Sequence, residues 1–472
     1  MTVDAEVERT EVDSLGEVVI PADALWGVNT ARAGANFPIT GRSCGQLRDL
    51  VWAYGAVKLA ACRANVEQGL LDERRGTAIE SACRELMQGE LDQCIIVDRV
   101  QGGAGTSTNM NVNEVVANRA LQLLGCAPGA YEVIDPLDHV NRSQSTNDTY
   151  FTAVRLAIHR SIERLIPALG RIAAECEARS VDFRDIVKIG RTQLQDAVPM
   201  TLGQEFSAFA ETIREDADRL EDFLPHLREI NLGATAIGTG ITAPVGYRES
   251  VVTRLSEISG YPLTSASDLI EATSDTGVFV LASGLLKRCA VKLSKISNDL
   301  RLLSSGPQAG LQEIVLPPVQ AGSSIMPGKV NPVIPEAVNQ VAFLVVGADA
   351  SVTMAAEAGQ LQLNAFGPVI ASSLLDSASL LTRGADLLAE RCVSGIRADG
   401  EFITARTKDS LAVATGLVPL LGYARTAALV KEALSSRRTL AELTLERGLL
   451  DEEQLNAALA PQNLTGEVAS AR

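Results

Sequence analysis

The side chains best suited to chemistry lie at residues 322–332, which read Gly-Ser-Ser-Ile-Met-Pro-Gly-Lys-Val-Asn-Pro. Two glycines and two prolines rule out a regular helix or strand, so the segment is predicted to be a loop between helical stretches. It holds two hydroxyls, one ammonium and one amide, and no acid. Backbone N–H groups near its start can form an anion-binding nest. An ordinary connector does not need this set of donors, so the loop is predicted to bind an anionic ligand.

Three further segments are rich in hydroxyl and amide side chains. They are predicted to be polar loops at residues 101–113, 141–148 and 190–196, and the first of them carries no charge at all. Such side chains bind carboxylate oxygens and amines by hydrogen bonds. Each segment taken singly also fits an ordinary turn or helix cap. For residues 190–196 that alternative is the start of a helix, capped by Thr192 or Asp196.

The distribution of charge restricts the partners of the chain. Its net charge is −16, which disfavours nucleic acid and anionic membrane surfaces as partners. The polar segments are less acidic, because they contain Arg142, Arg191 and Lys329 against Asp148 and Asp196. Since charges are screened over about 8 Å at physiological ionic strength, these local groups decide whether a dianion can bind.

Long helices are expected to position these segments. Apolar residues recur at steps of three and four from Ile158 to Cys176, and again from Leu285 to Leu303, as in packed helices. A third stretch, residues 336–363, is apolar on much of its circumference. A helix of that kind must be buried on all sides, which favours a bundle extended by other subunits over a large monomeric bundle.

The chain is expected to be mainly α-helical, with three parts. Residues 1–145 are predicted to form a mixed helix and loop domain, residues 146–395 a central helical bundle, and residues 396–472 a small helical domain. The eight cysteines are scattered, the N-terminus lacks an apolar stretch, and no run of 18 apolar residues occurs. These features predict reduced thiols, a cytoplasmic location, no membrane span and no metal site. None of the three histidines lies in the polar segments, which disfavours a Ser-His-Asp triad.

Residues 322–332 resemble the signature loop of the aspartase/fumarase superfamily, and the resemblance extends from Trp26 to the C-terminal helices. Within the superfamily, residues 189–199, 231–238 and 294–306 are most similar to aspartate ammonia-lyases. Gln193 carries weight here, because class II fumarases and some aspartases have histidine at this place. The resemblance implies a homotetramer built around a shared helical bundle, with active sites shared between subunits, and a dicarboxylate substrate. No cofactor is implied; activation by Mg²⁺ is compatible with the family, but no residue pattern indicates it.

The resemblance also implies a role for each candidate residue. Ser323 is the expected base, which removes a proton from Cβ of aspartate to give an aci-carboxylate. The β-carboxylate is expected to bind Thr106, Ser145, Thr146 and Ser324. The α-carboxylate is expected to bind Thr192, Lys329 and Asn331. The remaining contacts to the substrate, including those near the amino group, are expected from Asn147, Gln193 and Met326.

Some positions depart from the usual aspartase pattern, and they leave the substrate range open. These positions are Phe151, Ala321, Gly367, Ala412 and Val418. The alternatives are a class II fumarase and a lyase that acts on an N-substituted aspartate. A non-catalytic scaffold with the same fold is disfavoured, because Ser323 and Lys329 are both present.

Overall fold

The computed structural model describes residues 7–436 and 438–465. Long helices dominate it, and the strands of the described chain form three two-stranded sheets. The chain divides into two compact units. Unit 1 contains Met1–Pro167, Asp218–Ala290 and Val341–Thr382, and unit 2 contains Ala168–Ala217, Val291–Gln340 and Arg383–Arg472. This mainly α-helical architecture agrees with the expectation from the sequence, whereas the three-domain division stays a prediction.

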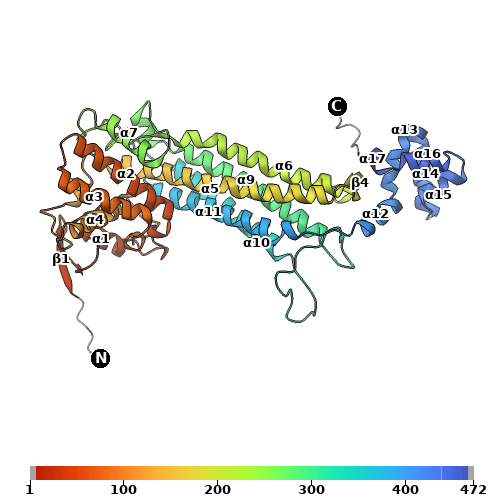
Figure 1. The fold of residues 1–472 in the computed structure, drawn as a ribbon, viewed down its shortest axis with the longest axis horizontal. Helices are drawn as coiled ribbons and strands as arrows, with labels where there is room; N and C mark the ends of the chain where they lie inside the picture. Colours follow the sequence, from red (N-terminus) through yellow and green to blue (C-terminus); the bar gives the residue numbers. More distant parts are fainter. Residues whose placement is uncertain (1–6, 437, 466–472) are drawn as a thin grey trace. The chain divides into compact units, whose positions relative to one another are not determined.

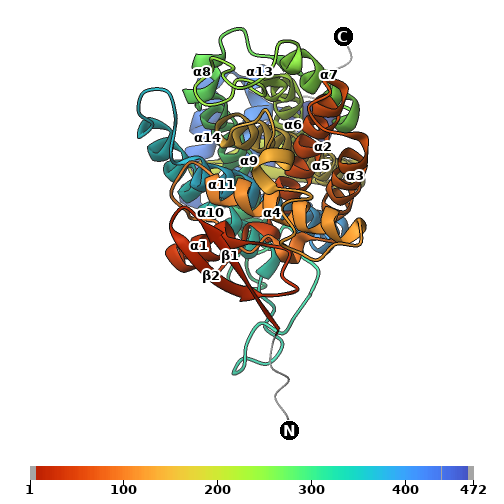
Figure 2. The same cartoon turned by 90° about the vertical axis from the view of Figure 1, so that its left-hand side faces the viewer.

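The first part of unit 1 is a hairpin followed by four helices. Strands β1 (Glu8–Asp13) and β2 (Gly16–Pro21) pair antiparallel. The helices are α1 (Val28–Asn36), α2 (Arg48–Glu67), α3 (Glu73–Gln88) and α4 (Thr106–Leu123). Helix α2 packs against α3 and α7 (Tyr247–Ser259), and α3 packs against α4 (Figure 2). The middle of α2 is therefore enclosed, and residues 49–62 are all buried.

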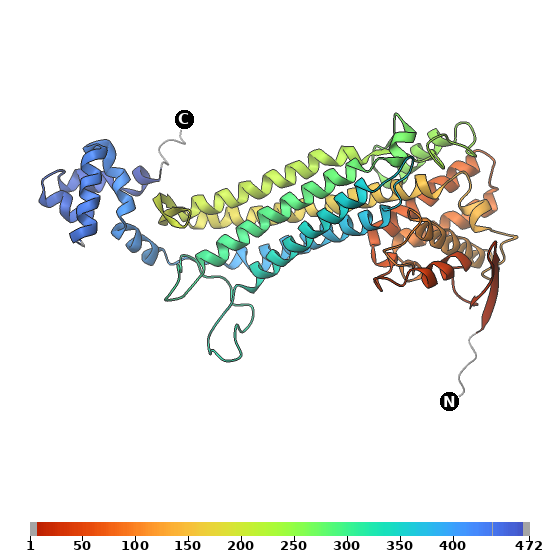
Figure 3. The same ribbon diagram turned by 180° about the vertical axis from the view of Figure 1, so that it is seen from behind.

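Five long helices run through the middle of the chain. They are α5 (Thr146–Asp182), α6 (Leu202–Phe223), α9 (Gly277–Leu303), α10 (Val333–Glu357) and α11 (Gly367–Arg391). Each helix contributes a segment to both units, and within each unit these segments lie side by side (Figure 1, Figure 3). All members of the predicted apolar series from Ile158 to Cys176 are buried in α5, which confirms it. In α9 the series is buried from Cys289 onward, but Leu285 is only half-buried and Leu286 takes the core position.

Helix α10 exposes apolar side chains in the single chain, and its burial by other subunits stays a prediction. It begins and ends earlier than predicted, and within the single chain Phe343, Leu344 and Met354 are 67%, 62% and 72% exposed. Among the described helices, α10 alone is long and apolar enough to cross a membrane by length and composition. Helices that pack in the core of water-soluble bundles pass the same test.

The C-terminal part of unit 2 is a cluster of short helices (Figure 1). They are α12 (Gly400–Asp409), α13 (Val418–Leu421), α14 (Tyr423–Ser436), α15 (Leu440–Glu446), α16 (Glu452–Ala458) and α17 (Pro461–Leu464). Asp451 and Gln454 form a capping box at the start of α16. Leu429 and Leu443 pack with Ile189 of a hairpin formed by β3 (Val187–Thr192) and β4 (Gln195–Thr201), so this hairpin is anchored to the C-terminal helices.

The remaining elements are short. Strands β5 (Glu229–Ile230) and β6 (Thr264–Ser265) pair parallel, and α8 spans Leu269–Ser274. Short helices of the 3-10 or π type lie at Cys44–Gln46, Asp92–Cys94, Pro136–Val140, Leu224–Leu227, Val393–Gly395 and Leu411–Leu417. All eight cysteines are free thiols, as predicted.

Candidate active site

The first polar segment presents Thr106 at the start of a helix rather than in a loop. The prediction of a loop over residues 101–113 is wrong beyond residue 105, because α4 begins at Thr106. Gly105 has a φ of +92°, and a Cβ there would lie 2.1 Å from the ring of Tyr150, so only glycine fits. The chain turns sharply at this glycine. Thr106 is exposed in the first helical turn, and its hydroxyl donates to the Gly103 carbonyl at 2.7 Å.

The second polar segment forms the start of α5. Ser145 precedes the helix, and its hydroxyl accepts a hydrogen bond from the Asn147 N–H at 3.2 Å. Thr146 is the first helical residue, so the loop predicted for residues 141–148 ends at Ser145. Asn147 donates from its amide to the Ala236 carbonyl at 2.7 Å. Thr106 and Thr146 thus both lie at helix N-termini, where unpaired backbone N–H groups and the helix dipole favour an anion.

Asp148 fixes the start of α5 to the segment at residues 231–238. Its carboxylate is fully buried and accepts from the backbone N–H groups of Ser145 at 3.0 Å, Gly233 at 3.0 Å and Thr235 at 2.9 Å. Burial raises the pKa of Asp148 to about 6, although these hydrogen bonds oppose the rise. The residue that sequence reasoning counted as a local negative charge is therefore a structural group that does not face solvent.

The sequence interpretation missed Lys58, which lies beneath both polar segments. Its ammonium is fully buried in α2 and donates to the side-chain oxygens of Asn109, Asn141 and Gln144, at 2.8, 3.0 and 2.9 Å. Burial lowers the pKa of Lys58 to about 7, and the charge of Asp148 opposes this effect. One signal was present, because Lys58 is the only charged residue between Asp49 and Arg63 in an otherwise apolar stretch. A buried lysine needs partners, and polar segments elsewhere in the chain were the candidates.

Thr192 and Gln193 lie at the tip of the β3–β4 hairpin. The alternative of a helix start at residues 190–196 is wrong, since β3 ends at Thr192 and β4 begins at Gln195. Gln193 and Leu194 have φ values of 53° and 62°, which are typical of a tight two-residue hairpin turn. The base of the hairpin is held by Glu313, whose carboxylate contacts Lys188 and Arg191 at 2.6 Å each. Arg191 is therefore neutralised by Glu313 and does not add a free positive charge.

The signature loop is irregular, as predicted, and is closed on itself. Gly322 donates its N–H to the Lys329 carbonyl at 2.8 Å, and the Asn331 amide donates to the Gly322 carbonyl at 2.7 Å. The Ser323 hydroxyl accepts from the N–H groups of Ile325 at 3.1 Å and Met326 at 2.9 Å. These two donors stabilise negative charge on the serine oxygen. Ser324, Met326 and Lys329 are exposed, and among the described residues no acid forms an ion pair with Lys329.

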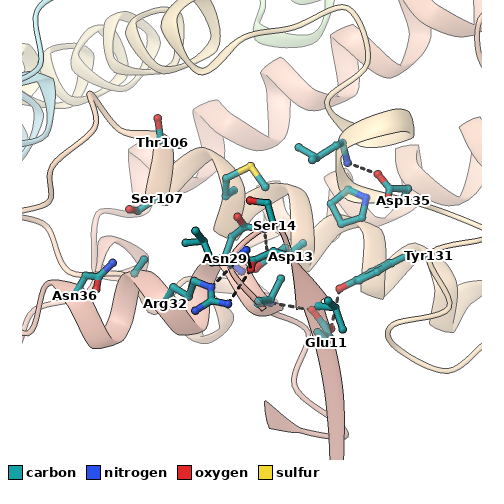
Figure 4. A pocket seen from close by; sticks show the side chains of 18 of the residues that line it. Glu11, Asp13, Ser14, Asn29, Arg32, Asn36, Thr106, Ser107, Tyr131 and Asp135 are labelled. Carbon is teal, nitrogen blue, oxygen red and sulfur yellow. Dashed lines mark hydrogen bonds and ion pairs between the residues drawn. The ribbon is translucent and has the colours of Figure 1, made fainter. Parts of the chain in front are cut away.

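A pocket of about 530 Å³ lies in unit 1 beside Thr106 and Ser107 (Figure 4). Its charged groups are mostly acids, and Asp13 is paired with Arg32 at 2.7 Å. Ser145 and Thr146 do not line this pocket. An acidic pocket repels a dicarboxylate, so we do not assign it to the substrate. Within the described ranges, no three His, Cys, Asp or Glu side chains are arranged to hold a metal ion.

The structure brings together only part of the predicted site. In unit 1 the Asn109 amide joins α4 to Thr146 at 3.1 Å, so the first two polar segments meet. In unit 2, Thr192 and Gln193 lie on an exposed hairpin tip, and Ser323 to Asn331 lie on the signature loop. In the described part of the chain, no hydrogen bond or ion pair joins that tip to the loop.

Comparisons with known proteins match the chain over nearly its whole length. A lyase family model matches residues 16–347, and a model of the fumarase C C-terminus matches residues 413–466. An aspartate ammonia-lyase of Pseudomonas aeruginosa is 53% identical over 97% of this chain and 96% of its own length. An aspartate ammonia-lyase of Escherichia coli is 48% identical, with the same two coverages.

Solved structures give the same result for the fold. A fumarate lyase:delta crystallin from Brucella melitensis, in a cobalt-bound crystal structure, is 54% identical with a TM-score of 0.94, covering 96% of this chain and 99% of that one. A class II fumarase from Schistosoma mansoni is 34% identical with a TM-score of 0.92, covering 97% of this chain and 99% of that one. The fold is therefore shared by proteins whose names refer to different reactions.

Proposed function

The chain belongs to the aspartase/fumarase superfamily of lyases, and from this premise we propose that it is an aspartate ammonia-lyase. The reaction is the reversible conversion of L-aspartate to fumarate and ammonia. The observation that carries the proposal is the near-complete match, at about half identity, to proteins named for this activity. Gln193 weighs against the fumarase alternative, because class II fumarases carry histidine at this place, as some aspartases also do.

In the proposed mechanism, Ser323 is the base. Its oxygen takes the Cβ proton of aspartate, and the electron pair of that C–H bond moves into the β-carboxylate to give a dianionic aci-carboxylate. The electrons then return to form the Cα–Cβ double bond as the Cα–N bond breaks and ammonia leaves. The N–H groups of Ile325 and Met326 support this role, because they stabilise a deprotonated serine before the proton arrives.

The negative charge that develops on the β-carboxylate requires donors that are already in place. We assign them to the hydroxyls of Thr106, Ser145, Thr146 and Ser324, and each such donor typically contributes about 10² to 10³ in rate. We assign the α-carboxylate to Thr192, Lys329 and Asn331. Asn147 and Gln193 would lie near the amino group, and Met326 would cover the substrate. These groups need no organic cofactor for the chemistry.

We further propose that the working enzyme is a cytoplasmic homotetramer with active sites shared between subunits. Phe343, Leu344 and Met354 expose apolar surface on α10, and copies of the same helix can cover it. Asp349 of α10 is paired with Lys287 at 2.5 Å and accepts from Ser283 at 2.7 Å, so a charged face of the helix is used for packing inside the chain. Burial of α10 against other subunits explains both the exposed apolar side chains and the Asp349–Lys287 pair better than insertion into a membrane does.

The proposal is tested by substrate choice. Fumarate absorbs in the ultraviolet, so its release from L-aspartate, L-malate and argininosuccinate can be followed directly with the purified protein. We expect the highest kcat/KM with aspartate. A higher value with malate would assign the chain to the fumarases, and a higher value with argininosuccinate would assign it to lyases of N-substituted aspartates.

A further inference from the structure

The side chains around Lys58 form a polar network that is buried and specific. The Lys58 ammonium has no exposed surface, and its three hydrogen-bond acceptors are amide oxygens from α4 and from the turn that precedes α5. In residues 7–436 and 438–465 no acid forms an ion pair with it. A buried cation whose direct partners are amides is costly, even with the charge of Asp148 nearby, so we expect it to have a role at this position.

The ammonium determines which way the amides point. In its protonated form, which the charge of Asp148 favours, Lys58 only donates, so the oxygens of its three amide partners face it and their NH₂ groups face away. The orientation of an amide is often ambiguous, but here the cation fixes it. The Asn109 NH₂ group donates to the Thr146 hydroxyl oxygen at 3.1 Å and to the Asn141 side-chain oxygen at 3.2 Å.

This direction has a consequence for Thr146. Because its oxygen accepts from Asn109, the hydroxyl keeps its own proton for another acceptor, and no described residue takes that proton. If Asn109 were reversed, its oxygen would face Thr146 and would take the proton instead. The ammonium of Lys58 prevents this reversal, since it repels the Asn109 NH₂ group.

We propose that Lys58 is a positioning residue, which acts through Asn109 to hold the Thr146 hydroxyl as a hydrogen-bond donor toward the substrate carboxylate. This inference rests on the proposed function, in which Thr146 binds the β-carboxylate. Lys58 itself does not touch the substrate. Its positive charge also lies beneath a site where negative charge develops, within a chain whose net charge is −16.

A double-mutant cycle tests the proposal with the full-length protein. Thr146→Val removes the hydroxyl at nearly constant volume, and we expect kcat/KM for aspartate to fall about 10²-fold, as for other single donors. Lys58→Met should give a loss at least as large. The variant with both changes should fall no further than Lys58→Met alone, because the same donor has already been lost. By contrast, the fold-losses in kcat/KM caused by Lys58→Met and by Thr192→Val should multiply in the double variant, since Thr192 lies on the separate β3–β4 hairpin.

Matched variants separate positioning from loss of structure. Arg63→Met removes a cation from the same helix, where Arg63 pairs with Glu80 on the surface, and should leave kcat/KM unchanged. Asn109→Asp keeps a partner for Lys58, but its carboxylate takes the Thr146 proton, so we expect a similar loss of kcat/KM with a preserved melting temperature. The double variant Asn109→Asp with Thr146→Val should have about the same kcat/KM as Asn109→Asp alone. If Lys58→Met does not fold, Asn109→Asp decides the question.

Each outcome has a distinct meaning. Losses from Lys58→Met and Thr146→Val that multiply, or wild-type activity in Asn109→Asp, would overturn the inference and leave the proposed function intact. Unchanged kcat/KM in Thr146→Val would instead contradict the proposed carboxylate site, and the inference would fail with it.

Discussion

At the scale of single residues, the proposed chemistry rests on Ser323 and Lys329, which make few contacts within the chain. Its oxygen accepts from two backbone N–H groups, and Lys329 lies six residues further along the same exposed loop. Neither residue belongs to the buried core, so substitutions here should affect the reaction and leave folding unchanged.

Ser323→Ala should therefore abolish nearly all turnover while the melting temperature stays the same. Lys329→Ala should raise KM as well as lower kcat, because it removes an electrostatic contact that the ground-state carboxylate already makes. Steady-state kinetics and thermal unfolding of the two variants check both statements. Near-normal turnover of Ser323→Ala would mean that another residue takes the proton.

Asp148 predicts a pH effect on stability with an unusual sign. Its pKa in the folded protein is about 6, above its ordinary value of 3.8, so the folded state holds this proton more tightly than the unfolded chain does. Its contribution to stability is then complete below about pH 4 and is lost as the pH rises through about 6.

Asp148→Asn removes this titration, although it also weakens the hydrogen bonds to the backbone. The advantage of the wild type over Asp148→Asn in melting temperature should shrink as the pH is raised from about 4.5 to about 6.5. A difference that stays constant, or grows with pH, would show that Asp148 is already charged in the folded protein at low pH.

At the scale of helices and strands, the sequence was most informative where packing repeats. The apolar series in α5 predicted buried positions correctly, because each turn of a long helix meets the same environment. The series in α9 was misplaced at its start, where Leu286 rather than Leu285 is buried. An apolar residue follows an apolar residue there, so periodicity alone could not choose between them.

The polar segments were harder to interpret from the sequence. Residues 106–113 resemble a loop because their amides and hydroxyls have low helix propensity, yet buried partners such as Lys58 satisfy them within α4. The hairpin at residues 187–201 was missed because its turn residues, Gln193 and Leu194, are not the usual glycine and asparagine. In both places contacts distant in the sequence override local preference.

Two departures from the usual aspartase pattern meet in the structure. A Cβ at Gly367, the first residue of α11, would lie 3.1 Å from the rings of both Phe151 and Tyr150 in α5. Alanine in a helix is normally more stable than glycine by roughly 0.5–1 kcal/mol. Here crowding by the two rings should outweigh that gain, so the effect of a side chain at 367 is expected to depend on the size of residue 151.

Gly367→Ala should consequently lower the melting temperature of the wild type. In a Phe151→Leu background the same change should lower it less, because one of the two rings that crowd the new methyl group is removed while Tyr150 remains. Four melting curves complete the cycle. Equal effects of Gly367→Ala in both backgrounds would show that the two positions are independent.

At the scale of the whole molecule, the candidate residues belong to two structural groups. Thr106, Ser145, Thr146 and Asn147 lie in unit 1, whereas Thr192 and Ser323 lie in unit 2 on separate exposed segments. The exposed apolar face of α10 supports our proposal that several subunits contribute to each site.

Complementation between inactive variants tests the shared site. Thr192→Ala and Ser323→Ala should each be nearly inactive, but unfolding and reassembling them together should restore activity. If the two residues of a site come from different subunits, about a quarter of the sites in a random mixture draw both from intact copies. Mixing without unfolding is the control and should restore nothing if subunits exchange slowly. A site built within one chain would recover no activity in either mixture.

The central claim is that this chain breaks the carbon–nitrogen bond of L-aspartate with Ser323 as the base. The most direct measurement is the simultaneous determination of fumarate and ammonia released from L-aspartate by the wild type and by Ser323→Ala. We predict one molecule of ammonia for each molecule of fumarate with the wild type, and almost none of either with Ser323→Ala. Ammonia without fumarate, no products from the wild type, or equal rates from the two proteins would contradict the account.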